Sequence, residues 1–159
     1  MKTTKIASVC QKSPMGALIV AEDLPLDEAI RRFASDATLH GIFLLDADDR
    51  FAGVISNRDL LDWARMQFDL LSRDFMLPVG KVRRLLNAKT VGDLALPDSV
   101  KMAASLEDSL ASALFTMSEY GLEDLAILDA EGRIVNDLRL SEVLHFALQI
   151  SMKRQQEAG

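Results

Sequence analysis

Apolar residues follow two alternating patterns along this chain, and the order of the patterns repeats. Continuous apolar runs at 17–21 and 42–45 have the length of buried strands, as does a run at 52–55 that follows a polar turn. Between the first two runs, apolar residues recur at helical spacing after Pro25, a residue suited to a helix start. A second helical pattern runs from 57 to about 73. The first half is therefore predicted to fold as strand, helix, strand, strand and helix.

The second half repeats this order. Ser105 and Asp108 resemble a capping box, and the apolar residues that follow them lie at helical spacing. Apolar runs at 125–128 and 134–138 predict two strands, and the pattern from 141 to about 152 predicts the last helix.

Two sequence matches support a duplication. In the first, the turn alignment, LDADDR at 45–50 reappears as LDAEGR at 128–133. In the second, the helix alignment, LDEAI at 26–30 matches LEDSL at 106–110, with a slightly smaller offset between the copies. Internal repeats determine architecture, so the chain is predicted to be an α/β (α+β) protein with a duplicated unit of helix, strand, turn, strand and helix. The two units are expected to pack as a pseudo-two-fold pair with a cleft between them.

The patterns also predict boundaries. These are an N-terminal segment at 1–16, a first unit at 17–73, a connector at 74–89, a second unit at 90–152 and a C-terminal tail at 153–159. Residues 1–14 carry no strong pattern, and the tail is expected to fray. Residues 81–87 predict one or two helical turns, in which Arg83 and Arg84 are expected to be solvated charges. We expect the connector to be held to the second unit by apolar side chains, those of Val91, Leu94 and Leu96.

The amino-acid composition argues against several classes of protein. Hydrophobic residues make up 49% of the chain, and the net charge of −6 argues against non-specific binding of nucleic acid or of an anionic membrane. The single cysteine, Cys10, cannot form an internal disulfide, and no apolar run is long enough to span a bilayer. A soluble, cytoplasmic protein without membrane insertion is expected.

The sequence gives no sign of catalysis. His40 and His145 lack the neighbouring ligands of a metal site, and Cys10 has no activating partner. Phosphate-binding loops, dinucleotide glycine motifs and nucleophile elbows are missing from the sequence. We predict no enzyme, no catalytic residues, no metal and no cofactor.

The segment GVISNRDLL at 53–61 carries the most specific chemistry. An apolar strand ends in the hydroxyl of Ser56, which can cap the following helix and, with the first free N–H groups, form an anion site. Asp59 lies one turn into that helix, where its carboxylate can accept hydrogen bonds from two neighbouring hydroxyls, as on a ribose. The alternative is structural, because a helix cap and a first-turn acid stabilise a helix without any ligand.

Together, the duplicated unit, the Leu-Asp-x-x-x-Arg turn and the Gly-Val-Ile-Ser-x-x-Asp-Leu motif resemble the CBS domain, named after cystathionine β-synthase. The segment TVGDL at 90–94 is similar to the one that introduces a second CBS copy. The resemblance implies two tandem β-α-β-β-α units packed as a pseudo-two-fold pair, which together form a Bateman module. The resemblance implies a cleft that holds an adenosine-containing ligand, such as AMP, ADP, ATP or S-adenosylmethionine.

The resemblance also assigns a first ligand site. Its residues are Gly53, Ser56, Asn57, Arg58, Asp59, Ile42 and Phe43. Ser56 would contact ribose or phosphate, Asp59 the ribose hydroxyls, and Ile42 and Phe43 the adenine. Asn57 and Arg58 fill the variable positions of the motif, and Arg58 is the candidate for a phosphate contact.

The second copy departs from this pattern. When the turn alignment is extended, Gly53 becomes Asn136, Ser56 becomes Arg139 and Asp59 becomes Glu142. Two interpretations stay open. Arg139 closes the second site, leaving one functional site in the chain, or Arg139 and Glu142 form a degenerate second site in which Arg139 recognises an acidic ligand.

The function predicted from these observations is a regulatory module. It binds an adenine nucleotide or another adenosine-containing metabolite and modulates an effector protein that the sequence does not identify. The alternative is a CBS scaffold that binds no ligand and serves dimerisation or partner interaction. The family implies a homodimer formed through helices.

Overall fold

The computed structural model describes residues 3–10, 15–68 and 79–159. Its elements are, in chain order, η1 (Ile6–Ser8), β1 (Leu18–Ala21), α1 (Leu26–Ala34), β2 (Gly41–Leu45), β3 (Phe51–Ser56), α2 (Asn57–Gln67), α3 (Val79–Asn87), α4 (Val91–Leu94), η2 (Ser99–Lys101), β4 (Ala103–Ala104), α5 (Leu110–Tyr120), β5 (Asp124–Leu128), β6 (Ile134–Arg139) and α6 (Leu140–Ala158). The strands form two three-stranded sheets, ordered β1-β2-β3 and β4-β5-β6. In each sheet the first pair of strands is parallel and the second antiparallel.

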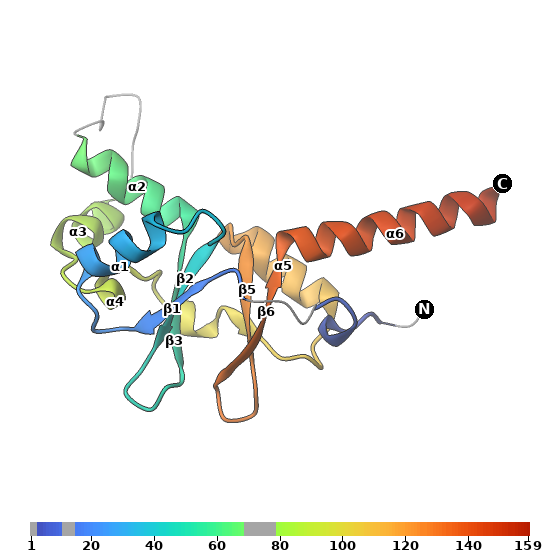
Figure 1. Cartoon of the computed structure of the whole chain (residues 1–159), viewed down its shortest axis with the longest axis horizontal. Coiled ribbons are helices and arrows are strands. Elements are labelled where there is room, and N and C mark those ends of the chain that lie inside the picture. Colours follow the sequence, from blue (N-terminus) through green and yellow to red (C-terminus); the bar gives the residue numbers. More distant parts are fainter. Residues whose placement is uncertain (1–2, 11–14, 69–78) are drawn as a thin grey trace.

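The predicted pair of β-α-β-β-α units is confirmed. The first unit consists of β1, α1, β2, β3 and α2, and the second of β4, α5, β5, β6 and α6. The two sheets stand side by side, with the β2–β3 and β5–β6 turns at the same end of the molecule (Figure 1). These turns are joined directly, because the Phe51 N–H donates to the Gly132 carbonyl at 2.9 Å.

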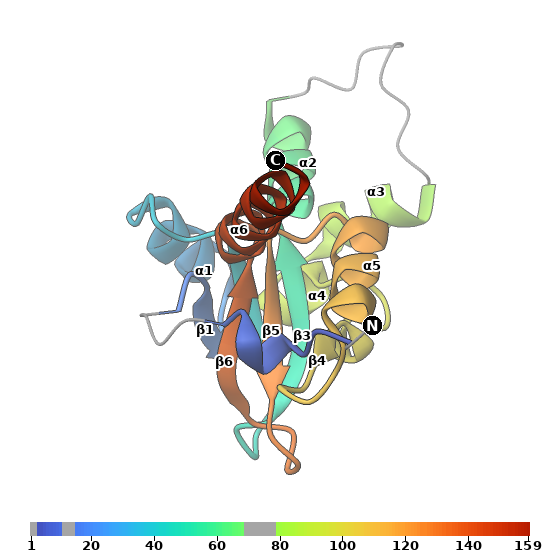
Figure 2. The same ribbon diagram turned by 90° about the vertical axis from the view of Figure 1, so that its right-hand side faces the viewer.

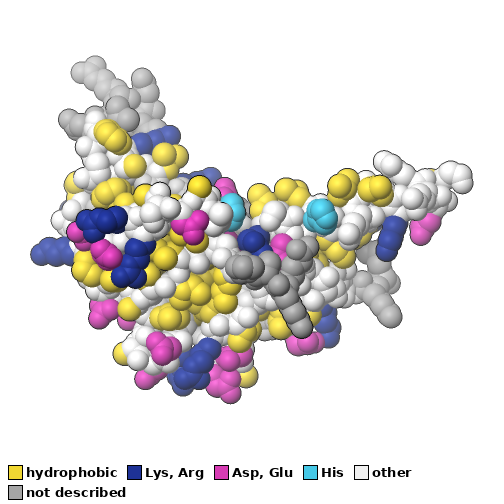
Figure 3. Space-filling model, in the orientation of Figure 1, with side chains coloured by type: hydrophobic (Ala, Val, Ile, Leu, Met, Phe, Trp, Pro, Cys, Tyr) yellow, Lys and Arg dark blue, Asp and Glu magenta, His cyan; other side chains and the backbone are white. Residues whose placement is uncertain are grey.

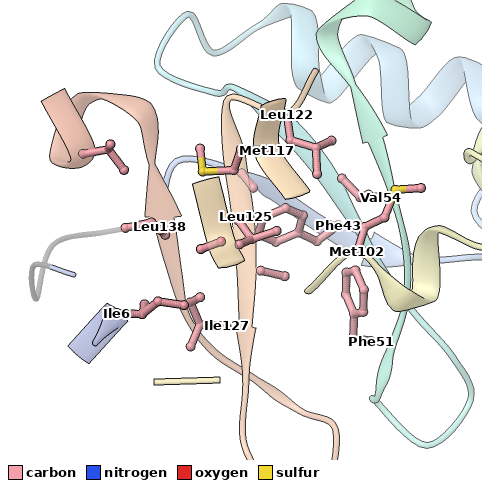
Figure 4. Close-up of a cluster of buried hydrophobic side chains, with 14 of the residues drawn as sticks. Ile6, Phe43, Phe51, Val54, Met102, Met117, Leu122, Leu125, Ile127 and Leu138 are labelled. Atoms are coloured by element: carbon pink, nitrogen blue, oxygen red, sulfur yellow. The ribbon is translucent and has the colours of Figure 1, made fainter. Parts of the chain in front are cut away.

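Successive side chains of β2 point alternately into two different hydrophobic cores. Ile42 and Leu44 face the first-unit core, beneath the unit's own helices. Phe43 points the other way, into a shared core that also contains the second unit's Leu125 and Ile127 (Figure 4). Phe43 packs edge-on against Phe51 with ring centroids 6.2 Å apart. Because the shared core draws side chains from both sheets, the units form one packed body.

The segments that precede the two units cross over. Residues 3–10 pack on the second unit, where the Ile6 N–H donates to the Asp108 carbonyl at 3.0 Å and Ile6 is buried in the shared core. Val91 makes the equivalent contact with the first unit, donating from its N–H to the Leu24 carbonyl at 2.8 Å. Residues 3–10, which carry no strong sequence pattern, are therefore an ordered part of the fold.

The connector prediction is wrong in part. Val91 and Leu94 lie in the first-unit core, and only Leu96 packs against the shared core of the second unit. The physical reason is the crossing, since a segment that begins the second unit in sequence completes the core of the first.

The two repeat alignments differ in accuracy. The turn alignment is confirmed, because Leu44 pairs with Gly53 in the first sheet as Ile127 pairs with Asn136 in the second. The helix alignment is wrong. Helix α5 begins at Leu110 after the cap Ser109, so Leu26 corresponds to Leu110, and Asp108 accepts from the Ser105 N–H in the turn before the helix.

The last helix is longer than predicted. α6 continues to Ala158, so the residues expected to form a frayed tail are helical. Figure 1 shows that this helix extends well beyond the sheet of its own unit, and Figure 2 looks nearly along its axis. The predicted continuation of α2 over 69–73, and the connector residues 74–78, lie outside the described residues.

Candidate functional site

The start of α2 forms a complete capping box. The Ser56 hydroxyl accepts from the Asp59 N–H at 3.2 Å, and Asp59 Oδ2 accepts from the Ser56 N–H at 3.3 Å and from its hydroxyl at 2.9 Å. Both side chains are buried, Asp59 with 1% of its surface exposed. The cap therefore commits one carboxylate oxygen, Oδ2, to the helix start.

The other oxygen faces two cations from α3. Lys81 Nζ and Arg84 Nη2 each lie 3.5 Å from Asp59 Oδ1. Lys81 also pairs closely with Asp62, and Arg84 Nη1 donates to the Ala95 carbonyl at 3.0 Å. The prediction that Arg84 is a solvated charge is wrong, because its side chain bridges α2 and the end of α4, whereas Arg83 is exposed as expected.

The variable motif positions face the second unit. Asn57 Nδ2 donates to Glu123 Oε2 at 2.9 Å, and His40 Nδ1 lies 3.6 Å from the same oxygen. Arg58 is exposed beside Gly121, the left-handed residue that ends α5. Asn57 and Arg58 thus lie at the junction of the units.

The remaining predicted residues of the first site surround the motif strand. A Cβ at Gly53 would lie 2.6 Å from the Ser99 hydroxyl, which accepts from the Val54 N–H at 3.0 Å. Ile42 and Phe43 are fully buried on opposite faces of β2. The structure therefore brings Ser56 and Asp59 together, lines Gly53 with η2, and places the Ile42 and Phe43 side chains in the two cores.

At the second copy, Arg139 takes the cap position of Ser56. Its N–H donates to Glu142 Oε1 at 3.1 Å, and its Nε lies 3.4 Å from the same oxygen and 3.7 Å from Asp137 Oδ2. Asp137 Oδ2 also accepts from the Gly16 N–H at 2.9 Å, and a Cβ at Gly16 would lie 2.6 Å from Arg139 Cδ. The long side chain is therefore enclosed between β6, α6 and the segment before β1.

Two buried acids beside Arg139 have no counterpart in the first copy and were not predicted. Burial, followed by a hydrogen bond and the charge of Asp137, raises the pKa of Asp124 to about 9. Burial and then the charges of Glu142, Asp137 and Asp124 raise the pKa of Cys10 to about 12, and its thiol donates to the Asp137 carbonyl at 3.3 Å. A signal existed in the sequence, because Asp124 and Asp137 stand where the first copy has Gly41 and Val54.

The α3 cations were also missed as site residues. Lys81 and Arg84 are spaced three apart and so share one helix face, next to the buried Leu85. That spacing was the available signal. Among the described residues, no cluster of three or more His, Cys, Asp and Glu side chains is suited to hold a metal ion, and no helix is long and apolar enough to cross a membrane.

Comparison with known proteins relates the first unit to a known family and the whole fold to solved structures. Residues 6–65 match the CBS domain model. The fold resembles a CBS domain-containing protein from Thermotoga maritima, with a TM-score of 0.70 and 21% identity over 91% of this chain and 94% of that one. It also resembles CBSX2 solved with AMP, with a TM-score of 0.63 and 21% identity over 93% and 98% of the two chains.

A third similar structure holds two adenosine compounds. It is the CBS domain pair of the protein MJ0100 in complex with 5′-methylthioadenosine and S-adenosyl-L-methionine, with a TM-score of 0.61 and 14% identity over 91% of this chain and 96% of that one. No curated protein sequence matches this chain. The CBS family model matches the first unit, and the similar structures share their fold with both units: this chain has the fold of a tandem CBS pair, the arrangement called a Bateman module.

Proposed function

We propose that this protein is a regulatory module that binds an adenosine-containing ligand in the first cleft, at Asp59. The observation that carries the proposal is that the two carboxylate oxygens of Asp59 have different partners. Oδ2 is committed to the helix cap, whereas Oδ1 has two contacts with the described residues, each of 3.5 Å and each to a cation. Since charge-assisted hydrogen bonds are usually about 2.7–2.9 Å long, Oδ1 is left with capacity for a ligand hydroxyl. The AMP and S-adenosylmethionine complexes of similar CBS pairs support an adenosine compound.

The roles within this site follow the motif. Asp59 accepts from the ribose diol, and Ser56 and the N-terminus of α2 lie next to it for a ribose or phosphate oxygen. Arg58, exposed at the junction, is positioned for a phosphate. Ile42 and Phe43 contribute backbone and packing beside the adenine, and Gly53 allows close approach of η2.

The second site is proposed to bind no acidic ligand, although a cavity lined by His40, Glu123 and Arg139 lies there. Arg139 is already paired with Asp137 and Glu142, which carry the charges that an acidic ligand would have to replace. One ligand for each chain is therefore expected. We propose that the ligand is not turned over, that the protein works in the cytoplasm, and that its effect is passed to a separate effector protein.

The test is thermal unfolding of the full chain with AMP, ADP, ATP, adenosine and S-adenosylmethionine. A ligand at about 100 times its dissociation constant stabilises the native state by about 2.7 kcal/mol, which raises Tm by roughly 5–10 °C in a domain of this size. Asp59→Asn should abolish the rise. Asp62→Asn is the matched control, because it also removes a buried acid that pairs with Lys81, one turn further along α2. Unchanged Tm with every compound would refute the ligand-binding proposal.

A homodimer is the second candidate function, and one surface favours it. Leu140, Leu144, Leu148 and Met152 recur every fourth residue along α6, and Leu144 and Leu148 are each 58% exposed. Figure 3 shows hydrophobic side chains along the upper edge of this helix. We propose that this stripe joins two copies. Light scattering should give twice the 17.5 kDa chain mass, Leu144→Glu with Leu148→Glu should give the monomer, and Gln149→Glu should change nothing.

A further inference from the structure

Asp59 is covered by the side chains of α3. Only 1% of Asp59 is exposed, and Arg84, at 16% exposure, spans from Asp59 Oδ1 to the Ala95 carbonyl. A ribose hydroxyl that is to reach Oδ1 must therefore take a place that a cation of α3 now fills.

Arg84 is a poorly satisfied partner in this position. Its Nη2 is 3.5 Å from Asp59 Oδ1, and its Nε is buried without a hydrogen-bond partner in the part of the chain that the structure describes. A buried donor that lacks an acceptor is destabilising, so this arrangement is weaker than a well-formed arginine–carboxylate pair. Lys81 differs, because it has a second and closer carboxylate in Asp62 and does not depend on Asp59.

We propose that Arg84 occupies the ribose position on Asp59 when no ligand is bound, so that binding is an exchange of one occupant for another. The proposal rests on the adenosine site proposed above and adds its regulation. When a ribose hydroxyl replaces the guanidinium, α3 loses its Arg84 contact with α2, while Lys81 keeps its pair with Asp62. The connector between the two units is thereby the element whose attachment the ligand changes.

The direction in which one substitution changes the ligand affinity tests this role of Arg84. A residue that contacts the ligand weakens binding when removed, whereas removal of a residue that blocks the site strengthens binding, because the competent fraction of molecules rises. Arg84→Met should bind adenosine about tenfold more tightly than the native chain, as measured by titration calorimetry. Arg83→Met, which removes an exposed cation next to it on the same helix, should leave the affinity unchanged.

A second ligand tests whether the change in affinity arises from the ribose hydroxyls. 2′,3′-Dideoxyadenosine lacks the hydroxyls that would exchange with Arg84, so Arg84→Met should not tighten its binding. If Arg84→Met does not fold, Arg84→Lys takes its place, since lysine keeps the charge but cannot bridge Asp59 and Ala95 with two donors. It should tighten adenosine binding by a smaller factor.

The possible failures are distinct. Equal or weaker binding of adenosine by Arg84→Met, with binding by the native chain intact, overturns the exchange and leaves the adenosine site standing. A loss of affinity for AMP but not for adenosine would make Arg84 a phosphate contact instead, which also overturns it. No binding of adenosine or AMP by either chain refutes the site and the exchange together.

Discussion

The packing of residues 3–10 on the second unit, which the sequence pattern did not predict, can be tested by measuring stability. Ile6 has no exposed surface and lies in the shared core, anchored by the backbone hydrogen bond to Asp108. Ile6→Ala removes three buried carbon atoms from the shared core. Substitutions of this kind cost about 2–5 kcal/mol, and we expect about 3 kcal/mol.

The effect is large enough to measure clearly. For a domain of this size, about 3 kcal/mol corresponds to a fall in Tm of roughly 6–12 °C. Urea denaturation followed by circular dichroism gives the free energy of unfolding for Ile6→Ala and for Ser8→Ala, an exposed control two residues away. The control should change stability by less than about 0.5 kcal/mol. If Ile6→Ala matches the control, the segment is not part of the core and the crossing is wrong.

Three further predictions concern Asp124, Cys10 and Gly53. The pKa of Asp124 is raised from 3.8 to about 9 in the folded chain, so the native state binds the extra proton between these values and stability falls as pH rises across that window; in urea denaturation, Asp124→Asn should therefore stabilise more at pH 8 than at pH 5, and an equal effect at both would contradict the shift. Because the pKa of Cys10 is about 12, its thiol should react with Ellman's reagent far more slowly at pH 8 in the native chain than in urea, and equal rates would show an accessible thiolate. Gly53→Ala places a Cβ 2.6 Å from the Ser99 hydroxyl and should destabilise by about 1–3 kcal/mol, whereas Gly80→Ala, in open space on α3, should stabilise by up to about 1 kcal/mol; a neutral Gly53→Ala would mean that η2 can move away.

Local patterns predicted the regular elements well. The strands β2 and β5 are continuous apolar runs, and the Ser56 cap with Asp59 one turn later follows directly from residue type and spacing. Short loops between these elements left few ways to connect them. The same motif predicted where α2 begins, because a strand that ends in a capping serine fixes the start of the helix.

Hydrophobic periodicity could not predict the contacts between residues that are far apart in the sequence. Val91 and Ile6 each have the same short apolar signature, but nothing in that signature says which unit will bury it. The contact between Arg84 and Asp59 joins residues 25 positions apart, and helical spacing alone could not tell a buried cation from a solvated one. The helix alignment was wrong because LEDSL resembles LDEAI in composition, although the helix begins only at Leu110.

The crossed segments interlock the two halves of this protein. Each half completes its neighbour's interior, Ile6 in one direction and Val91 in the other, so neither half is a self-sufficient folding piece. Pulling the halves apart would peel off two hydrogen-bonded segments at once and expose both interiors, which makes unfolding a single cooperative event. Conformational change in the folded chain is therefore limited to a small rotation of the halves or local release of a helix, because separating the halves exposes both cores.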